Sequence, residues 1–244
     1  MQPQATELDG RPVKPALGWA VHLFTASGVI ISLLAIDALL RHKWREVLLW
    51  LLLALVIDGV DGTLARAVRI KESVPRIDGE ALDLIVDYLN YVFIPTLLMW
   101  RGGLFPDSIE LPLSAMILLS SLYVFVRRDM KTDDGYFRGV PALWNVVALY
   151  FVLTQPDAWL SAAIVLALVA LTFAPILFVH PFRSADCGRP ALAIASIWAL
   201  STLLLLLVPN SAKLWNVLLY CSIGSALALV LLGIVRTFRR REPA

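Results

Sequence analysis

Cysteine, charge and linker sequence are all scarce in this chain. Two cysteines, Cys187 and Cys221, occur among 244 residues, too few for the disulfide framework of small secreted domains. Charged residues make up 16% of the chain, whereas soluble domains contain about 25%. No stretch rich in proline, glycine and serine divides the sequence into halves. These absences exclude a disulfide-stabilised domain and favour a single integral domain over residues 1–244.

The net charge and the first residues exclude two further classes. A net charge of +2 at pH 7 gives no basic footprint for nucleic acid, so no nucleic-acid partner is expected. The first 15 residues contain charges and prolines but no apolar segment ending in a small-residue cleavage site. No cleavable signal peptide is therefore expected.

Apolar residues, in contrast, make up 59% of the chain and gather in long continuous runs. A membrane-spanning helix needs about 20 mostly apolar residues, and continuous runs favour helices over the alternating strands of a barrel. We therefore predict an all-α, polytopic transmembrane helix bundle of about eight spans. The predicted spans are residues 16–40, 44–68, 81–100, 111–126, 140–154, 159–179, 191–208 and 214–235.

Lysine and arginine fall mainly on one side of this predicted bundle. Eight spans place both termini on the same side of the membrane. Of the 21 Lys and Arg residues, the opposite side carries Arg41, Lys43, Arg45, Arg101 and Lys213. Because basic loops stay in the cytoplasm, we predict a bacterial inner-membrane protein with both termini cytoplasmic. The basic residues in 236–241 are expected to anchor the C-terminus to anionic phospholipid headgroups.

Two aspartates interrupt the apolar sequence of the second predicted span. Asp58 and Asp61 lie three residues apart, so they share one helix face. Gly62 and Ala65 continue that face, and Arg66 lies beside it. For any one of these residues the alternative is structural, either a helix-end ion pair with Arg66 or a glycine that lets helices pack closely.

The third predicted span carries a second acidic face. Gly79, Asp83 and Asp87 recur at intervals of four residues and therefore share a helix face. The connection over residues 67–78 is short, so it brings the cytoplasmic ends of the two spans together. An ionised carboxylate at membrane depth costs several kcal/mol unless a partner neutralises it. The clustered carboxylates therefore predict bound cations.

Oxygen ligands of this kind suit hard divalent cations. Two such ions about 3.5–4 Å apart are a common device for displacement at phosphorus. We therefore predict two ions of Mn²⁺ or Mg²⁺, with glycines nearby leaving room for a polar substrate. The predicted ligands are Asp58, Asp61, Asp83 and Asp87. The alternative of a cation transporter is disfavoured, because the carboxylates cluster at one leaflet rather than at mid-membrane.

These residues match the signature of the CDP-alcohol phosphotransferase family, which the chain resembles. That signature runs Asp-x2-Asp-Gly-x2-Ala-Arg, then a spacer, then Gly-x3-Asp-x3-Asp. Every fixed position is present: Asp58, Asp61, Gly62, Ala65, Arg66, Gly79, Asp83 and Asp87. The spacer, residues 67–78, is longer than is usual in the family, which leaves the shape of the nucleotide-side loop open.

Further segments resemble the bacterial phosphatidylcholine synthases within that family. They are residues 22–28, 71–79, 85–95 and 136–145. The resemblance implies transfer of a phosphatidyl group from CDP-diacylglycerol to choline, giving phosphatidylcholine and CMP, with Mn²⁺ or Mg²⁺. It also implies that Asp87 is the general base, and that the CDP group is framed by Gly62, Ala65, Arg66 and Gly79. A sister enzyme that uses serine, inositol or glycerol 3-phosphate is the alternative, and a homodimer is left open.

Choline would need aromatic faces and acidic groups, because a quaternary ammonium has no N–H to donate. The candidates near the acidic faces are Tyr91, Tyr136, Asn90, Glu80 and Trp144. The alternative for the aromatic residues is the ordinary belt of Trp and Tyr at helix ends. In the first span, His22 is predicted to be a satisfied polar residue rather than a ligand. Thr25 and Ser27 are predicted to bond to their own helix, and contact with the nucleotide is the alternative.

Overall fold

The computed structural model of the chain describes residues 15–130, 132, 136–178 and 188–241, and helices dominate it. The helices are α1 (Pro15–Leu40), α2 (Trp44–Ala67), α3 (Ile70–Ser73), α4 (Gly79–Asp87), η1 (Tyr88–Phe93), α5 (Ile94–Arg101), α6 (Glu110–Val126), α7 (Trp144–Thr154), α8 (Ala158–Thr172), α9 (Gly188–Leu207) and α10 (Lys213–Arg241). Two short strands, β1 (Phe137–Arg138) and β2 (Leu177–Phe178), pair antiparallel. The prediction of a helical membrane-type bundle is confirmed.

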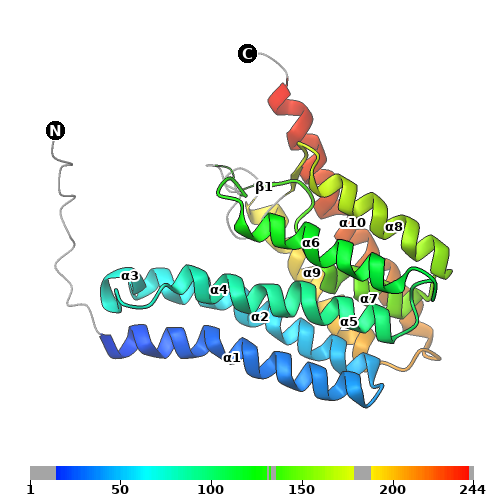
Figure 1. Cartoon of the computed structure of the whole chain (residues 1–244), viewed down its shortest axis with the longest axis horizontal. Helices are drawn as coiled ribbons and strands as arrows, with labels where there is room; N and C mark the ends of the chain where they lie inside the picture. The colour runs from blue at the N-terminus through cyan, green and yellow to red at the C-terminus, as the bar shows by residue number, and fades with distance from the viewer. Residues whose placement is uncertain (1–14, 131, 133–135, 179–187, 242–244) are drawn as a thin grey trace.

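The helices form two groups, one of α1, α2 and the rod of α4, η1 and α5, the other of α9 and α10. The two groups meet where α2 contacts α9. Figure 1 shows α1, α2 and the rod of α4, η1 and α5 running side by side, with α6 and α8 packed above them. Helix α1 contacts both α2 and α4, whereas α9 pairs with α10 and also contacts α2. The main core includes the fully buried Val47 of α2, Val92 of η1, Leu98 of α5 and Ile117 of α6.

The third rod is one helix interrupted by a turn of π-helix. It begins at the N-cap Asp78, whose carboxylate accepts hydrogen bonds from the backbone N–H of Glu80 and Ala81. The π-helical turn η1 comes just before Pro95, which lacks an N–H and whose ring clashes with the carbonyl four residues earlier. A π-turn widens the helix locally and relieves that conflict. The rod therefore continues from Gly79 to Arg101 without a break.

Five helical segments are long and apolar enough to cross a membrane. They are Pro15–Leu40, Trp44–Ala67, Gly79–Arg101, Gly188–Leu207 and Lys213–Phe238. The predicted fourth, fifth and sixth spans correspond to the shorter apolar helices α6, α7 and α8, of 17, 11 and 15 residues. The chain is therefore of membrane type, and the count of eight spans stays a prediction.

The predicted sixth span, residues 159–179, is wrong at its C-terminal end. Helix α8 ends at Thr172, and Leu177–Phe178 form β2 instead, because Pro175 cannot continue the helix. The strand pair is tied to α10, since the Leu177 N–H donates to Thr237 Oγ1 at 2.8 Å. Gly139 follows β1 with φ +82°, a backbone conformation that favours glycine. The expectation of an all-α chain is therefore wrong at this pair of strands.

The crossing of α1 and α4 depends on a glycine. A Cβ added at Gly28 would overlap Val86 Cγ1 and lie 3.6 Å from Asn90 Nδ2. We expect Gly28→Ala to destabilise the protein by about 1–3 kcal/mol, because overpacking displaces one helix from the other. The measurement is the midpoint of thermal unfolding in detergent. The matched control is Gly224→Ala, where the added Cβ meets nothing within 4 Å; equal midpoints for both variants would contradict the prediction.

Candidate functional site

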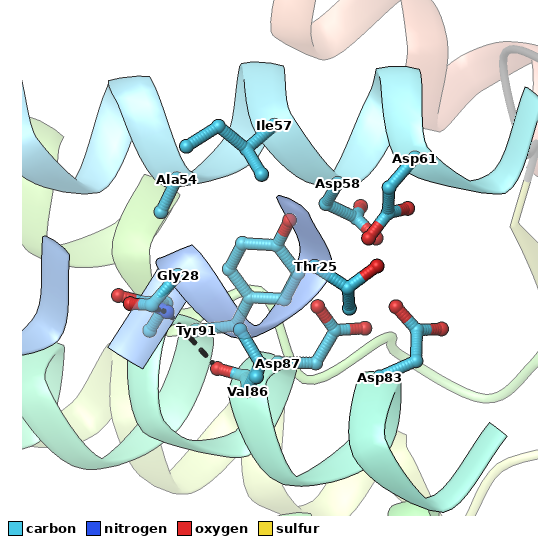
Figure 2. Close-up of a pocket in the computed structure, with 11 residues that line it drawn as sticks. Thr25, Gly28, Ala54, Ile57, Asp58, Asp61, Asp83, Val86, Asp87 and Tyr91 are labelled. Atoms are coloured by element: carbon cyan, nitrogen blue, oxygen red, sulfur yellow. Dashed lines mark hydrogen bonds between the residues drawn. The ribbon is translucent and has the colours of Figure 1, made fainter. Parts of the chain in front are cut away.

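Three of the predicted aspartates converge between α2 and α4. Asp58, Asp83 and Asp87 each offer a carboxylate oxygen, and these oxygens lie within 4.8 Å of one another. All three side chains are partly buried, and Figure 2 shows the carboxylates directed toward one another across the gap between the helices. Such an arrangement of oxygen atoms fits a hard divalent cation and repels itself without one.

Asp61 lies in the same pocket but is bound differently. It is 4% exposed, and its carboxylate lies beside the Thr25 side chain. Figure 2 shows Thr25 of α1 between the aspartates of α2 and those of α4. The prediction that Ser27 bonds to its own helix is confirmed, because Ser27 donates to Phe24 O at 2.6 Å, whereas Thr25 faces the aspartates.

Helix α1 closes one side of the pocket, a role that was not predicted from the sequence. Thr25 and Gly28 line the pocket, and Ser32 lies one turn further along the same helix. Their spacing of three and four residues is a polar and small-residue stripe that indicates a buried helix face. That spacing was the available signal in the sequence.

Two other predicted residues, Asn90 and Tyr91, line the inner end of the pocket. Asn90 Nδ2 donates to Gly28 O at 3.2 Å and Val86 O at 3.0 Å, and its Oδ1 accepts from Ser32 Oγ at 3.0 Å. Its amide therefore joins α1 to the third rod. The Tyr91 side chain is 5% exposed, and its hydroxyl lies beside Asp58 (Figure 2). Tyr91 thus closes the end of the pocket away from Asp83.

Known proteins are similar to this chain over most of its length. The chain is 47% identical to the phosphatidylcholine synthase of Pseudomonas aeruginosa over 80% of this chain and 82% of that protein. The Bradyrhizobium diazoefficiens phosphatidylcholine synthase is 41% identical over 83% and 76%, and that of Rhizobium johnstonii 32% over 90% of each chain. The chain therefore belongs to the phosphatidylcholine synthase family. No family model matches the sequence.

In this member of the phosphatidylcholine synthase family, the other signature residues are not among those that line the pocket, namely Gly62, Ala65, Arg66 and Gly79. Ala65 is partly buried, and the exposed Arg66 donates to Thr63 Oγ1 at 3.1 Å. Gly79 begins α4, and a Cβ there would lie 2.9 Å from His22 Cε1, so the glycine admits the imidazole ring. His22 Nε2 is buried with no hydrogen-bond partner in the described part of the chain, so the expectation of a satisfied histidine was wrong.

Three predicted choline contacts are not among the residues that line this pocket. Glu80 is exposed and accepts a hydrogen bond from Lys71 Nζ at 2.6 Å, which raises the pKa of Lys71. Tyr136 is fully buried with the Arg236 guanidinium 5.6 Å from its ring centroid. The Trp144 Nε1–H donates to Ser121 Oγ at 2.7 Å. A role for these residues in choline binding stays a prediction.

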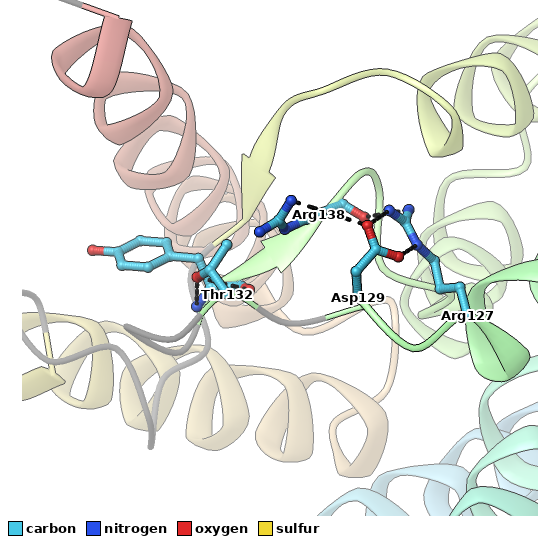
Figure 3. A network of polar contacts seen from close by, with 5 residues as sticks. Arg127, Asp129, Thr132 and Arg138 are labelled. Atoms are coloured by element: carbon cyan, nitrogen blue, oxygen red, sulfur yellow. Dashed lines mark hydrogen bonds and ion pairs between the residues drawn. The ribbon is translucent and has the colours of Figure 1, made fainter.

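The basic residues that follow α6 form their own network. Arg127 donates to Asp129 through Nε at 2.9 Å and Nη2 at 2.8 Å, and this lowers the pKa of Asp129 to about 2. Arg138 also approaches Asp129, at 4.0 Å, as Figure 3 shows. The guanidinium of Arg127 lies over the ring of Tyr123 at 5.5 Å. These arginines are therefore engaged with neighbours of their own, beside the strand β1.

The aspartate triad generates a direct test for metal binding. We expect Asp58→Asn, Asp83→Asn and Asp87→Asn each to weaken Mn²⁺ binding by roughly tenfold or more, because each removes a charged ligand. Electron paramagnetic resonance of free Mn²⁺ titrated with purified protein measures the affinity. The control is Asp37→Asn, which changes an exposed carboxylate that pairs with Arg41 at 3.0 Å. Unchanged affinity in all three variants would exclude the triad as the metal site.

Proposed function

We propose that the chain transfers the phosphatidyl group of CDP-diacylglycerol to choline, releasing CMP and phosphatidylcholine. The convergence of Asp58, Asp83 and Asp87 at one end of two membrane helices supports this proposal most directly. Membership in a family of phosphatidylcholine synthases supports the identity of the product. A pocket at the membrane surface suits the reaction, since the lipid tails stay in the bilayer while choline and CMP exchange with water.

The proposed step is a displacement at the phosphorus that carries diacylglycerol. The choline oxygen forms the new P–O bond, and the bond from that phosphorus to the oxygen of CMP breaks. Choline is a weak nucleophile, so a carboxylate placed to accept its hydroxyl proton accelerates the attack. We assign this proton to Asp87, which lies between Asp83 and Tyr91 on the inner face of the third rod. The electron pair of the broken bond leaves with CMP.

The residues present fit one or two divalent cations. Asp58, Asp83 and Asp87 would hold the first, and Asp61, which lines the same pocket, would contribute to the second. Bound Mn²⁺ or Mg²⁺ would polarise the phosphoryl oxygens and neutralise the charge of the departing CMP. Gly62, Ala65, Arg66 and Gly79 would surround the CDP group on the outer side of the aspartates. A small residue at three of these four positions leaves room for the nucleotide.

We also propose that the chain crosses the bacterial inner membrane eight times, with both termini and the pocket facing the cytoplasm. The distribution of Lys and Arg supports this orientation. Helix α7 has 11 residues and is about 16 Å long, which is shorter than the hydrocarbon core. The segment before α7 would complete the crossing, and the burial of Tyr136 and Ala142 suits non-helical backbone at membrane depth.

The acceptor alcohol can be tested with a panel of substrates. We expect purified protein with CDP-diacylglycerol and Mn²⁺ to release CMP when choline is added, and little when serine, inositol or glycerol 3-phosphate replaces it. Release with another alcohol instead would identify a sister enzyme. Ion flux into proteoliposomes without any CMP release would indicate a transporter.

The general base generates a second prediction. We expect Asp87→Asn to lower kcat by roughly 10²–10⁴-fold, because the choline proton loses its acceptor and the metal site a ligand. Excess chelator should abolish CMP release by the unmodified protein, and added Mn²⁺ or Mg²⁺ should restore it. Asp37→Asn serves as the control for a changed carboxylate away from the pocket. Full turnover by Asp87→Asn would overturn the assignment.

A further inference from the structure

The hydroxyl of Tyr91 is an unpaired polar group at the aspartate pocket. Tyr91 lines the pocket, and its Oη is buried with no hydrogen-bond partner in the described part of the chain. Its neighbours in the π-helical turn η1 differ, because Tyr88 Oη donates to Leu118 O at 3.0 Å and the Asn90 amide makes three hydrogen bonds. A buried hydroxyl without a partner destabilises a protein, and hydrocarbon cannot supply one. The hydroxyl therefore points to a partner that it gains when a ligand binds.

The position of this hydroxyl favours Asp58 as the acceptor. Figure 2 shows the Tyr91 ring reaching from the third rod toward α2, with its oxygen beside Asp58. Ala54 and Ile57 of α2 also line the pocket, and neither has a polar side-chain atom. Asp61 lies three residues further along α2. A hydrogen bond from Tyr91 to Asp58 would join the third rod to α2 at the inner end of the pocket.

Asp58 is the member of the aspartate triad that comes from α2. Asp83 and Asp87 are one turn apart on α4, so their own helix fixes their spacing. The position of Asp58 relative to them depends on how α2 packs against the third rod. A carboxylate that binds a cation through one oxygen can accept a hydrogen bond at the other, and such partners orient metal ligands. A phenol suits this role because it donates one hydrogen bond and adds no positive charge beside the cation.

We propose that Tyr91 is a positioning residue, which donates a hydrogen bond from Oη to the carboxylate of Asp58 when the aspartates hold a divalent cation. This inference rests on the proposed function for the presence of the cation, and it does not depend on the acceptor alcohol. It gives the hydroxyl of Tyr91 a role separate from any contact between its ring and choline.

Tyr91→Phe removes the hydroxyl and keeps the ring. We expect the dissociation constant for Mn²⁺ to rise roughly 10- to 100-fold, as is typical when a metal ligand loses its hydrogen-bond partner. Electron paramagnetic resonance of free Mn²⁺ titrated with the purified full-length protein measures this constant. The unfolding temperature without metal should not fall, because the deleted hydroxyl had no partner. The KM for choline at saturating Mn²⁺ should stay the same, because the aromatic face remains.

Tyr88→Phe is the matched control, because it removes a hydroxyl from the same π-helical turn but outside the pocket. It should lower the unfolding temperature without metal, since the hydrogen bond to Leu118 O is lost, and leave the affinity for Mn²⁺ unchanged. The two variants should therefore show opposite patterns. A merely structural role for Tyr91 would give both variants the pattern of Tyr88→Phe.

The pairing with Asp58 is tested by combining the substitutions. Tyr91→Phe should weaken Mn²⁺ binding less in the Asp58→Asn protein than in the unmodified protein, because residues in contact do not act additively. Unchanged affinity in folded Tyr91→Phe, or an undiminished effect in the Asp58→Asn background, would overturn the proposal. Failure of the unmodified protein to bind Mn²⁺ would overturn the proposed metal site as well, so the two failures are distinguishable.

Discussion

The mutual repulsion of three carboxylates is the constraint on which this structure depends. Two unit charges 4 Å apart repel by about 4 kcal/mol at the effective dielectric constant of a protein surface. Asp58, Asp83 and Asp87 hold their oxygens within 4.8 Å of one another, so the surrounding bundle must resist their separation. A divalent cation would turn that repulsion into attraction. The same helices would then have to hold this spacing both without and with the cation.

The rigidity comes from contacts that lie one turn away from the charges. Gly28 allows α1 to approach Val86 closely, and Asn90 then joins α1 to the third rod through two hydrogen bonds. The carboxylate of Asp78 secures the first turn of α4. Thr25 of α1 lies beside Asp61 of α2. Helix α1 and the third rod are thus joined by polar contacts that lipid cannot replace.

The acidic faces were predictable because helical spacing is a local property of the sequence. Asp83 and Asp87 share a face whatever surrounds them, and the short connection between spans brings Asp58 close. The place of Thr25 in the pocket was not predictable in this way, because the aspartates that it faces lie on other helices. The end of α8 was missed since residues 173–179 remain apolar although Pro175 ends the helix. An apolar sequence indicates burial, but it does not distinguish a short strand from the continuation of a helix.

The residues that line the aspartate pocket all lie between Thr25 and Tyr91. A chain is synthesised from its N-terminus, and membrane helices insert largely in that order. The segments that build the pocket therefore reach the bilayer while α6 to α10 are still being made. The helices that carry the aspartates are thus synthesised first. The later helices then pack against helices whose charged residues are already in place.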